Sequence, residues 1–252
     1  MEEEKYPFLQ KYLPEWLKEQ INFIQSKEWI ENEQLKTEDT IQIGYTFLKK
    51  IEGLIKRFES IEGFSQWVIE AKNSRENFKH FLFELMSLEN LLSKSDKLIL
   101  KPHNKTSSKN PEALIIKNGT SFYAEMTFLD SLPSSIINKV DKLFDKSRKK
   151  FAGLSGIHFI GAFNFFNYPE GKEKSLPELN SLVKLIQLKF KRFGSSTLAF
   201  VLVNIYANYN PKLIDTSFPK KFIILPNPNK KLPDAFFQNL FEVDEFQFIE
   251  SV

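Results

Sequence analysis

A chain of 252 residues, of which 42% are hydrophobic and 27% charged, can form one large domain or a domain with an extension. It has no cysteine, which excludes disulfides and thiolate metal sites, and no apolar run approaches the roughly 20 residues of a membrane-spanning helix. The start MEEEKYPF lacks the basic and then apolar order of a secretory signal, so we expect a cytoplasmic protein with no membrane partner.

Charge is unevenly distributed along the chain. Residues 1–94 have a net charge of −4, residues 95–152 of +5 and the remainder of +2. A locally positive field favours a polyanionic partner such as nucleic acid. The middle segment is therefore where we expect such a contact.

Hydrophobic periodicity predicts helices first and strands later. Helical spacing covers residues 9–23, 41–58 and 77–92, followed by strand-like runs at 97–101, 112–117, 121–128, 157–166, 197–206 and 221–225. Two further helices, residues 134–151 and 176–193, interrupt the strands. The order predicts an all-helical region over residues 1–76 and an α/β domain with a C-terminal extension over residues 77–252.

A β-hairpin is predicted where the dipeptide Asn118-Gly119 separates two runs of β-forming residues. Asn-Gly favours a type I′ turn, in which both central residues have positive φ. If these two residues form the turn, the register places Glu112 opposite Glu125 on one face of the sheet. Like charges at this separation destabilise a sheet, so the pair needs hydration or a cation.

Strand alternation sets the surroundings that we expect for Glu125. Phe122, Ala124, Met126 and Phe128 share the opposite, apolar face and are expected to pack on a helix, while the face with Glu125 is expected to open to a cleft. Carboxylates on adjacent strands are typical ligands of Mg²⁺ or Mn²⁺, which favour oxygen. The alternatives are a solvent-exposed pair without metal, or a β-bulge that shifts the register.

These residues resemble the motifs of the restriction-endonuclease-like, or PD-(D/E)XK, nuclease superfamily. Its signature is Pro-Asp at the start of one strand and Asp/Glu-any-Lys on the next, often with a glutamate on the preceding helix. Three segments are similar to it: Pro111-Glu112, Glu125-Met126-Thr127 and, on the helix, Glu84. The similarity spans residues 77–167 and includes the order helix, three strands, helix, strand. It implies a central mixed β-sheet flanked by helices.

The resemblance also implies a chemistry, in which Mg²⁺ or Mn²⁺ ions activate water and stabilise charge on a phosphodiester of nucleic acid. It makes Glu112 and Glu125 metal ligands, with the Met126 carbonyl as a possible third. Glu84 would hold a metal-bound water or a second ion. On a helical wheel Glu89 lies deeper in the apolar arc than Glu84, so Glu89 is the alternative buried acid.

The motif lysine is replaced by Thr127, whose hydroxyl cannot supply a positive charge. Some branches of the superfamily are similar in taking a basic residue from the following helix. The helix predicted over residues 134–151 carries a lysine stripe beside its apolar face: Lys139, Lys142, Lys146, Lys149 and Lys150. We expect the stripe to bind nucleic acid, and the resemblance makes Lys146 and Lys150 candidates for the displaced catalytic lysine. A solvated helix flank is the alternative.

The sequence contains no motif of the other catalytic classes considered. The three histidines, His80, His103 and His158, have no metal-ligand spacing, and there is neither a phosphate-binding glycine-rich loop nor a G-x-S-x-G sequence. Three functions remain: a metal-dependent nuclease, a nuclease-fold protein that binds nucleic acid or a protein partner without cleavage, or an interaction protein. In the last, the acidic N-terminal helices contact a protein partner or a second copy of the chain.

Overall fold

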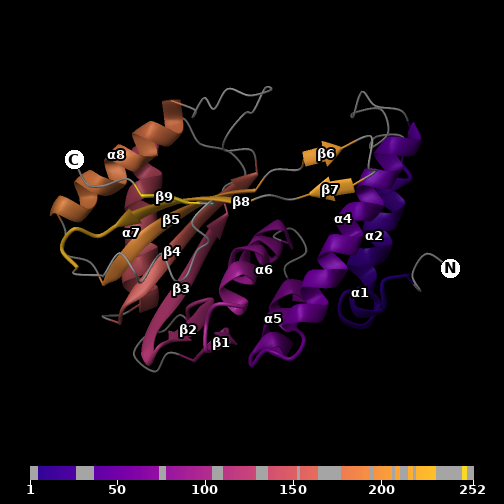
Figure 1. Cartoon of the computed structure of the whole chain (residues 1–252), viewed down its shortest axis with the longest axis horizontal. Helices are drawn as coiled ribbons and strands as arrows, with labels where there is room; N and C mark the ends of the chain where they lie inside the picture. Colours follow the sequence, from indigo (N-terminus) through magenta and orange to yellow (C-terminus); the bar gives the residue numbers. More distant parts are fainter. Residues whose placement is uncertain are drawn as a thin grey trace. The chain divides into compact units, whose positions relative to one another are not determined.

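The computed structural model of the chain contains two compact units (Figure 1). The first comprises Met1–Leu85 and Ala207–Pro219, and the second comprises Met86–Tyr206 and Lys220–Val252. The structure describes residues 5–26, 37–73, 78–103, 110–128, 136–151, 154–163, 177–192, 196–205, 208–210, 215–217, 220–230 and 246–248. Within these residues, no helix combines the length and apolarity needed to cross a lipid bilayer.

The first unit is mainly helical. Its elements are α1 (Pro7–Tyr12), α2 (Pro14–Ile24), α4 (Thr37–Phe58), α5 (Phe64–Asn73), the first half of α6 (Phe78–Leu92) and a hairpin of β6 (Asn208–Asn210) and β7 (Asp215–Ser217). The periodicity did not predict α5, β6 or β7. The hairpin belongs to this unit although it follows the strands of the second unit in the chain.

The stretch predicted as continuous helix over residues 9–23 is two helices that meet at Leu13. Pro14 opens α2, where its missing N–H costs no hydrogen bond. The carboxylate of Glu52 caps α1 by accepting hydrogen bonds from the backbone N–H of Phe8, at 2.9 Å, and of Leu9, at 2.8 Å. A capping acid on a distant helix leaves no signal in the local sequence.

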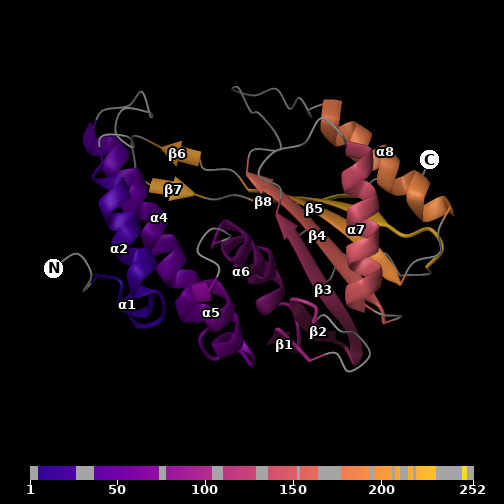
Figure 2. The same cartoon turned by 180° about the vertical axis from the view of Figure 1, so that it is seen from behind.

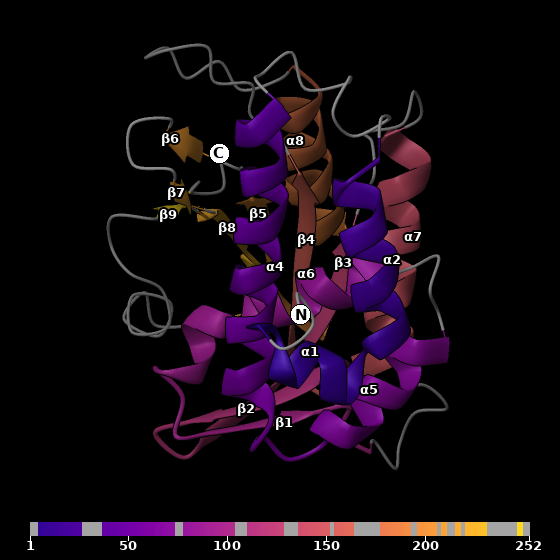
Figure 3. The same cartoon turned by 90° about the vertical axis from the view of Figure 1, so that its right-hand side faces the viewer.

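Helices α2 and α4 pack side by side (Figure 3). A Cβ atom added to Gly44 would lie 2.6 Å from Cγ1 of Ile24, so the absence of a side chain permits this close approach. Leu17, Ile21 and Leu48 are buried. This apolar face, rather than helix propensity alone, stabilises the pair.

The second unit is built on a seven-stranded mixed sheet with the order β1-β2-β3-β4-β5-β8-β9. The strands are β1 (Lys97–Leu100), β2 (Ala113–Lys117), β3 (Thr120–Phe128), β4 (Gly156–Phe163), β5 (Thr197–Ile205), β8 (Lys220–Pro226) and β9 (Phe246–Phe248). Strands β1, β2 and β3 form an antiparallel meander, whereas β3, β4 and β5 are parallel neighbours. The predicted α/β fold with a mixed sheet flanked by helices is thus confirmed, with β9 as an unpredicted edge strand.

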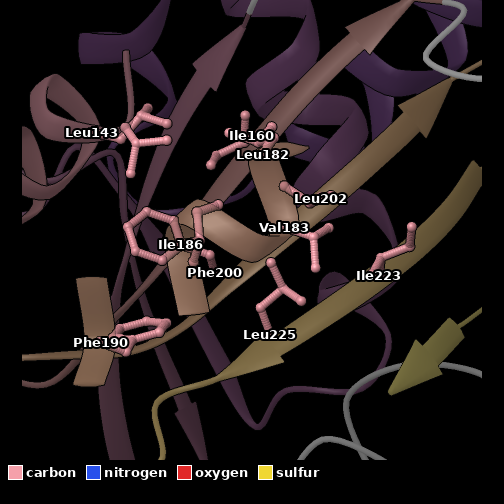
Figure 4. Close-up of a cluster of buried hydrophobic side chains, with 11 residues drawn as sticks. Leu143, Ile160, Leu182, Val183, Ile186, Phe190, Phe200, Leu202, Ile223 and Leu225 are labelled. Atoms are coloured by element: carbon pink, nitrogen blue, oxygen red, sulfur yellow. The ribbon is translucent and has the colours of Figure 1, made fainter. Parts of the chain in front are cut away.

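Parallel neighbours require crossover connections, which two helices provide. Helix α7 (Ile136–Phe151) joins β3 to β4, and α8 (Pro177–Arg192) joins β4 to β5. The two helices pack against each other and against one face of the sheet (Figure 2). Their shared core, shown in Figure 4, contains Val140, Leu143, Ile160, Leu182, Val183, Ile186, Phe190, Phe200, Leu202, Ile223 and Leu225.

The predicted hairpin of β2 and β3 is confirmed. Asn118 and Gly119 have φ of 49° and 74°, and Lys117 pairs with Thr120. The carboxylate of Asp96 accepts a hydrogen bond from the backbone N–H of Asn118 at 2.6 Å. The register is the one that a two-residue turn dictates, and it holds as far as the pair Ala113–Ala124.

Candidate functional site

Five charged side chains of the second unit meet where β1 ends, β2 begins and α7 crosses β3. We call them the carboxylate–lysine cluster: Lys101, Glu112, Glu125, Lys146 and Lys150. The sequence predicted four of them as site residues, and Lys101 is the addition.

Glu112 lies one residue before β2, not inside it as predicted. Its backbone N–H donates to the carbonyl of Ala124 at 3.0 Å, one residue out of step with the ladder. The direct pairing expected for Glu112 and Glu125 is therefore replaced by an irregularity of the bulge type. The two carboxylates nevertheless share the ammonium group of Lys150.

Lys101 and Lys150 compensate the charge of Glu112. The Lys101 ammonium donates to Oε2 of Glu112, and Lys150 Nζ lies 3.0 Å from Oε1. Lys101 has a φ of 46°, uncommon for a residue with a side chain, and its N–H bonds to the Glu112 carbonyl at 2.8 Å. Burial raises the pKa of Glu112, but the two ammonium groups outweigh it and lower the pKa to about 2.

Glu125 is fully buried, which corrects the expectation that its face opens to a cleft. Lysines of α7 cover it, with Lys146 Nζ 2.7 Å from Oε1 and Lys150 Nζ 3.3 Å from Oε2. Among the described residues, however, neither carboxylate oxygen has a hydrogen bond of normal geometry. Burial and the charge of Glu112 raise the pKa of Glu125, against the opposing effect of Lys146 and Lys150. The carboxylate is therefore poorly compensated.

Lys150 bridges the two carboxylates. Burial lowers its pKa, but Glu125 and Glu112 outweigh burial and raise the pKa above its ordinary value. Its ammonium also donates to the carbonyl of Asn110 at 2.6 Å. Lys150 thus lies where a cation shared by the two carboxylates would bind.

Lys146 reaches the strand position where the motif lysine is missing. Its ammonium donates to the carbonyl of Met126 at 2.9 Å and to Oγ1 of Thr127 at 3.0 Å. The side chain is 33% exposed, so it connects the buried Glu125 with solvent. A lysine from α7 therefore stands beside the second carboxylate, and its catalytic role stays a prediction.

Two residues that the sequence analysis did not single out as functional lie behind Thr127. His158 on β4, fully buried and stacked on the ring of Phe200, contacts Oγ1 of Thr127 through Nε2 at 2.8 Å. Its Nδ1 lies 2.6 Å from Oγ of Ser147, a buried residue of α7. An isolated histidine in an apolar strand gives no sequence signal of this kind.

The rest of the lysine stripe lies on the outer side of α7. Lys142 and Lys149 are exposed and Lys139 is half-buried. A surface depression of about 260 Å³ is lined by Lys142, Asp145, Lys146, Lys149 and Lys150. Four lysines against one aspartate give this depression a positive charge that suits phosphate groups.

Glu84 is placed in the first unit, and its contacts there are specific. Trp67 Nε1 donates to its Oε2 at 3.0 Å, and His80 Nε2 lies 3.6 Å from Oε1. The side chain is buried, whereas the alternative acid Glu89 is half-buried. Trp67 therefore provides Glu84 with a partner in its own unit, and its role toward a metal stays a prediction.

The donor set of the cluster fits a divalent cation. Glu112 and Glu125 offer carboxylate oxygens, which Mg²⁺ and Mn²⁺ prefer, and both oxygens of Glu125 are buried without a normal hydrogen bond. Among the described residues no group of three or more acidic, histidine or cysteine side chains gathers for a metal. A cation would compete with the ammonium of Lys150 for the same oxygens.

The pKa of Glu112 leads to an expected pH dependence of stability. A carboxyl whose pKa falls from 4.5 to about 2 on folding stabilises the fold above pH 4.5, and this stability is lost as the pH falls toward 2. The raised pKa of Glu125 acts in the opposite direction, so the measurement uses the Glu125→Gln background. In that background, we expect Glu112 to contribute unfolding free energy that is present above pH 4.5 and is lost as the pH falls toward 2.

Urea unfolding at a series of pH values, with and without the additional change Glu112→Gln, measures this contribution. The double variant should show a smaller decline in this window, which arises from the carboxyls that remain, such as Glu59. Equal declines in the two proteins would contradict the assigned ion pairs.

Comparison with known proteins finds no matching family model, curated protein or solved structure. The cluster itself has three chemical features: two buried carboxylates, a lysine that links Glu125 to solvent, and a positive depression beside them.

Proposed function

We propose that the chain is a metal-dependent phosphodiesterase acting on nucleic acid, with the carboxylate–lysine cluster as its active site. The observation that carries the proposal is the position of Lys146. Its ammonium lies 2.7 Å from the buried Glu125 and bonds to Thr127, the position at which the similar nuclease motif has its lysine. This supports a division of the motif between β3 and α7.

Glu112 and Glu125 would hold Mg²⁺ or Mn²⁺, which when bound supplies an activated water and stabilises negative charge on phosphate. Lys146, partly exposed, would place its positive charge beside the scissile phosphate and so stabilise its transition state. Hydrolysis forms a bond from the water oxygen to phosphorus and breaks the bond to one ester oxygen. The Met126 carbonyl accepts a hydrogen bond from Lys146, which supports a role in holding the lysine.

The remaining lysines of the stripe would position the substrate. Lys142 and Lys149 are exposed beside Lys146 and would contact phosphates that flank the scissile bond. Such contacts fix the register of the polyanion without reading its bases.

The proposal is tested by incubating the full chain with single- and double-stranded DNA and RNA in Mg²⁺, in Mn²⁺ and in chelator. Cleavage of at least one substrate with either metal, and none in chelator, is the expected result. Equal cleavage in chelator, or no cleavage of any substrate with either metal, would contradict it.

A second candidate function, binding of nucleic acid without cleavage, is favoured by one observation. The ammonium groups of Lys101, Lys146 and Lys150 surround the two carboxylates and supply counter-charges without a metal. With Thr127 in the lysine position, the cluster would then stabilise a binding surface. Salt-dependent binding without metal-dependent cleavage would be the outcome in its favour.

Both candidates predict the same effect for the exposed lysines. Changing Lys142 and Lys149 together to glutamine should weaken nucleic-acid binding, because neither side chain can then neutralise a phosphate. The slope of log affinity against log salt should fall in magnitude by about 2. The matched control is Lys184→Gln on α8, also an exposed helical lysine, which should leave the slope unchanged. Fluorescence anisotropy with a labelled oligonucleotide measures the slopes. An unchanged slope in the double variant would mean that the depression is not the binding surface.

A further inference from the structure

A continuous chain of polar contacts runs behind the lysine that completes the cluster. From α7 it passes from Lys146 to Thr127 on β3, then to His158 on β4, and returns through Ser147 to the carbonyl of Leu143 on α7. His158 and Ser147 are fully buried. A buried polar chain of this kind is stable when each group has its partner.

Of the hydrogen arrangements that fit these four contacts, one also gives every hydrogen an acceptor among them. The Leu143 carbonyl can only accept, so Ser147 donates to it and accepts from Nδ1–H of His158. The Lys146 ammonium can only donate, so Thr127 accepts from it and donates its own hydrogen to Nε2 of His158. His158 is then neutral, with its hydrogen on Nδ1. If both ring nitrogens carried a hydrogen, the hydroxyl hydrogen of Thr127 would have no acceptor among these contacts.

We propose that His158 is a positioning residue that, together with Ser147, orients the Thr127 hydroxyl to hold the Lys146 ammonium beside Glu125. The inference deepens the proposed function and rests on it. In this arrangement Thr127 is not the remnant of a lost catalytic lysine. Its hydroxyl is instead the docking point for a lysine supplied by α7. The positive charge comes from the helix, while the strand still determines where that charge lies.

The geometry of Lys146 explains why such a docking point is needed. The ammonium has three hydrogens and three oxygen neighbours: Glu125 Oε1 at 2.7 Å, the Met126 carbonyl at 2.9 Å and Thr127 Oγ1 at 3.0 Å. A lysine side chain has a flexible four-carbon stem, so several fixed acceptors are required to hold it in one place. Of these three acceptors, Thr127 is the one whose hydroxyl orientation depends on another side chain, that of His158.

The first test measures the reactivity of the Lys146 amine in the absence of substrate and metal. Limited acylation followed by mass spectrometry of peptides gives its rate relative to exposed Lys142 in the same molecule. In Thr127→Val, which keeps the shape and removes the hydroxyl, we expect the relative rate at Lys146 to rise about tenfold. Thr127→Ser should restore the wild-type rate. An unchanged rate in Thr127→Val, or a rate in Thr127→Ser equal to that of the valine variant, would overturn the proposal.

The second test needs no variant. Nitrogen chemical shifts of the imidazole of His158 in the folded wild-type chain distinguish the two neutral tautomers from imidazolium. The neutral form with hydrogen on Nδ1 is expected, and either other form would overturn the proposal.

Neither test depends on cleavage, so they separate this inference from the proposed function. If the chain cleaves nucleic acid, Thr127→Val should lower kcat while leaving KM nearly unchanged, because Lys146 would act on the scissile phosphate. If the chain does not cleave, the labelling and nitrogen shifts still decide whether His158 and Thr127 place Lys146.

Discussion

Changing Glu125 to glutamine is expected to lower metal-dependent cleavage by about a thousandfold or more. Glutamine has nearly the same shape as glutamate, but its neutral amide is a poor ligand for a hard cation. Burial and the charge of Glu112 raise the pKa of Glu125, so losing this charge removes an unfavourable ionisation and the variant should remain folded. Initial rates on the best substrate, with equal nucleic-acid affinity measured separately, show the effect.

The matched control is Glu15→Gln, the same chemical change at an exposed carboxylate of α2. It should cleave at the wild-type rate. Cleavage by Glu125→Gln within a few-fold of wild type would remove Glu125 from the active site, and the Glu112 carboxylate would then have no partner for the metal.

Changing Lys150 to methionine is expected to lower the unfolding free energy by about 3–5 kcal/mol in the absence of metal. Methionine preserves most of the side-chain length and removes the ammonium that Glu112 and Glu125 share at 3.0 and 3.3 Å. Among the described residues, the two buried carboxylates then keep Lys101 and Lys146 as counter-charges. Urea unfolding in chelator measures the loss.

Millimolar Mn²⁺ should restore much of this loss, because the cation would take the place that Lys150 vacates. Mn²⁺ should therefore stabilise Lys150→Met more than it stabilises the wild type. Lys184→Met, at an exposed lysine of α8, should respond to Mn²⁺ as the wild type does. A Lys150→Met protein that is destabilised and gains nothing from Mn²⁺ would mean that the carboxylates hold lysines alone.

Local signals predicted the parts of the site that lie within one hairpin or one helix. Asn118-Gly119 fixed the turn and therefore the register of β2 and β3, since a two-residue loop leaves no choice of pairing. The helical wheel of α7 grouped Lys146 and Lys150 on one flank, and that flank does face the two carboxylates. Both are consequences of short-range geometry.

The sequence could not predict contacts between residues that long connections separate. The connection of residues 101–112 between β1 and β2 is too long for a two-residue turn to set the register, so Lys101 could not be assigned to Glu112 from the sequence. Alternation assigned Glu125 to a face but carried no information about what covers that face. His158 and Ser147 meet through the packing of α7 on β4, which neither residue's neighbours in the chain indicate.

The N-terminal half shows the same limit. Helical periodicity identified the apolar face of residues 9–23, but not the break at Leu13, where Pro14 starts a new helix, nor the cap that Glu52 of another helix gives to the start of α1. The hairpin of β6 and β7 joins the helical unit from a distant part of the chain. These features arise from tertiary contacts that override local pattern.

The central claim, that Glu112 and Glu125 form a divalent-metal site, is tested most directly by melting temperature with and without millimolar Mn²⁺. A ligand bound only by the folded chain stabilises it by about 2.7 kcal/mol at a hundredfold excess over Kd. We predict that Mn²⁺ raises the melting temperature of the wild type and leaves that of Glu125→Ala unchanged. An equal shift in the two proteins, or no shift in the wild type together with a more stable variant, would contradict the metal site and with it the proposed nuclease.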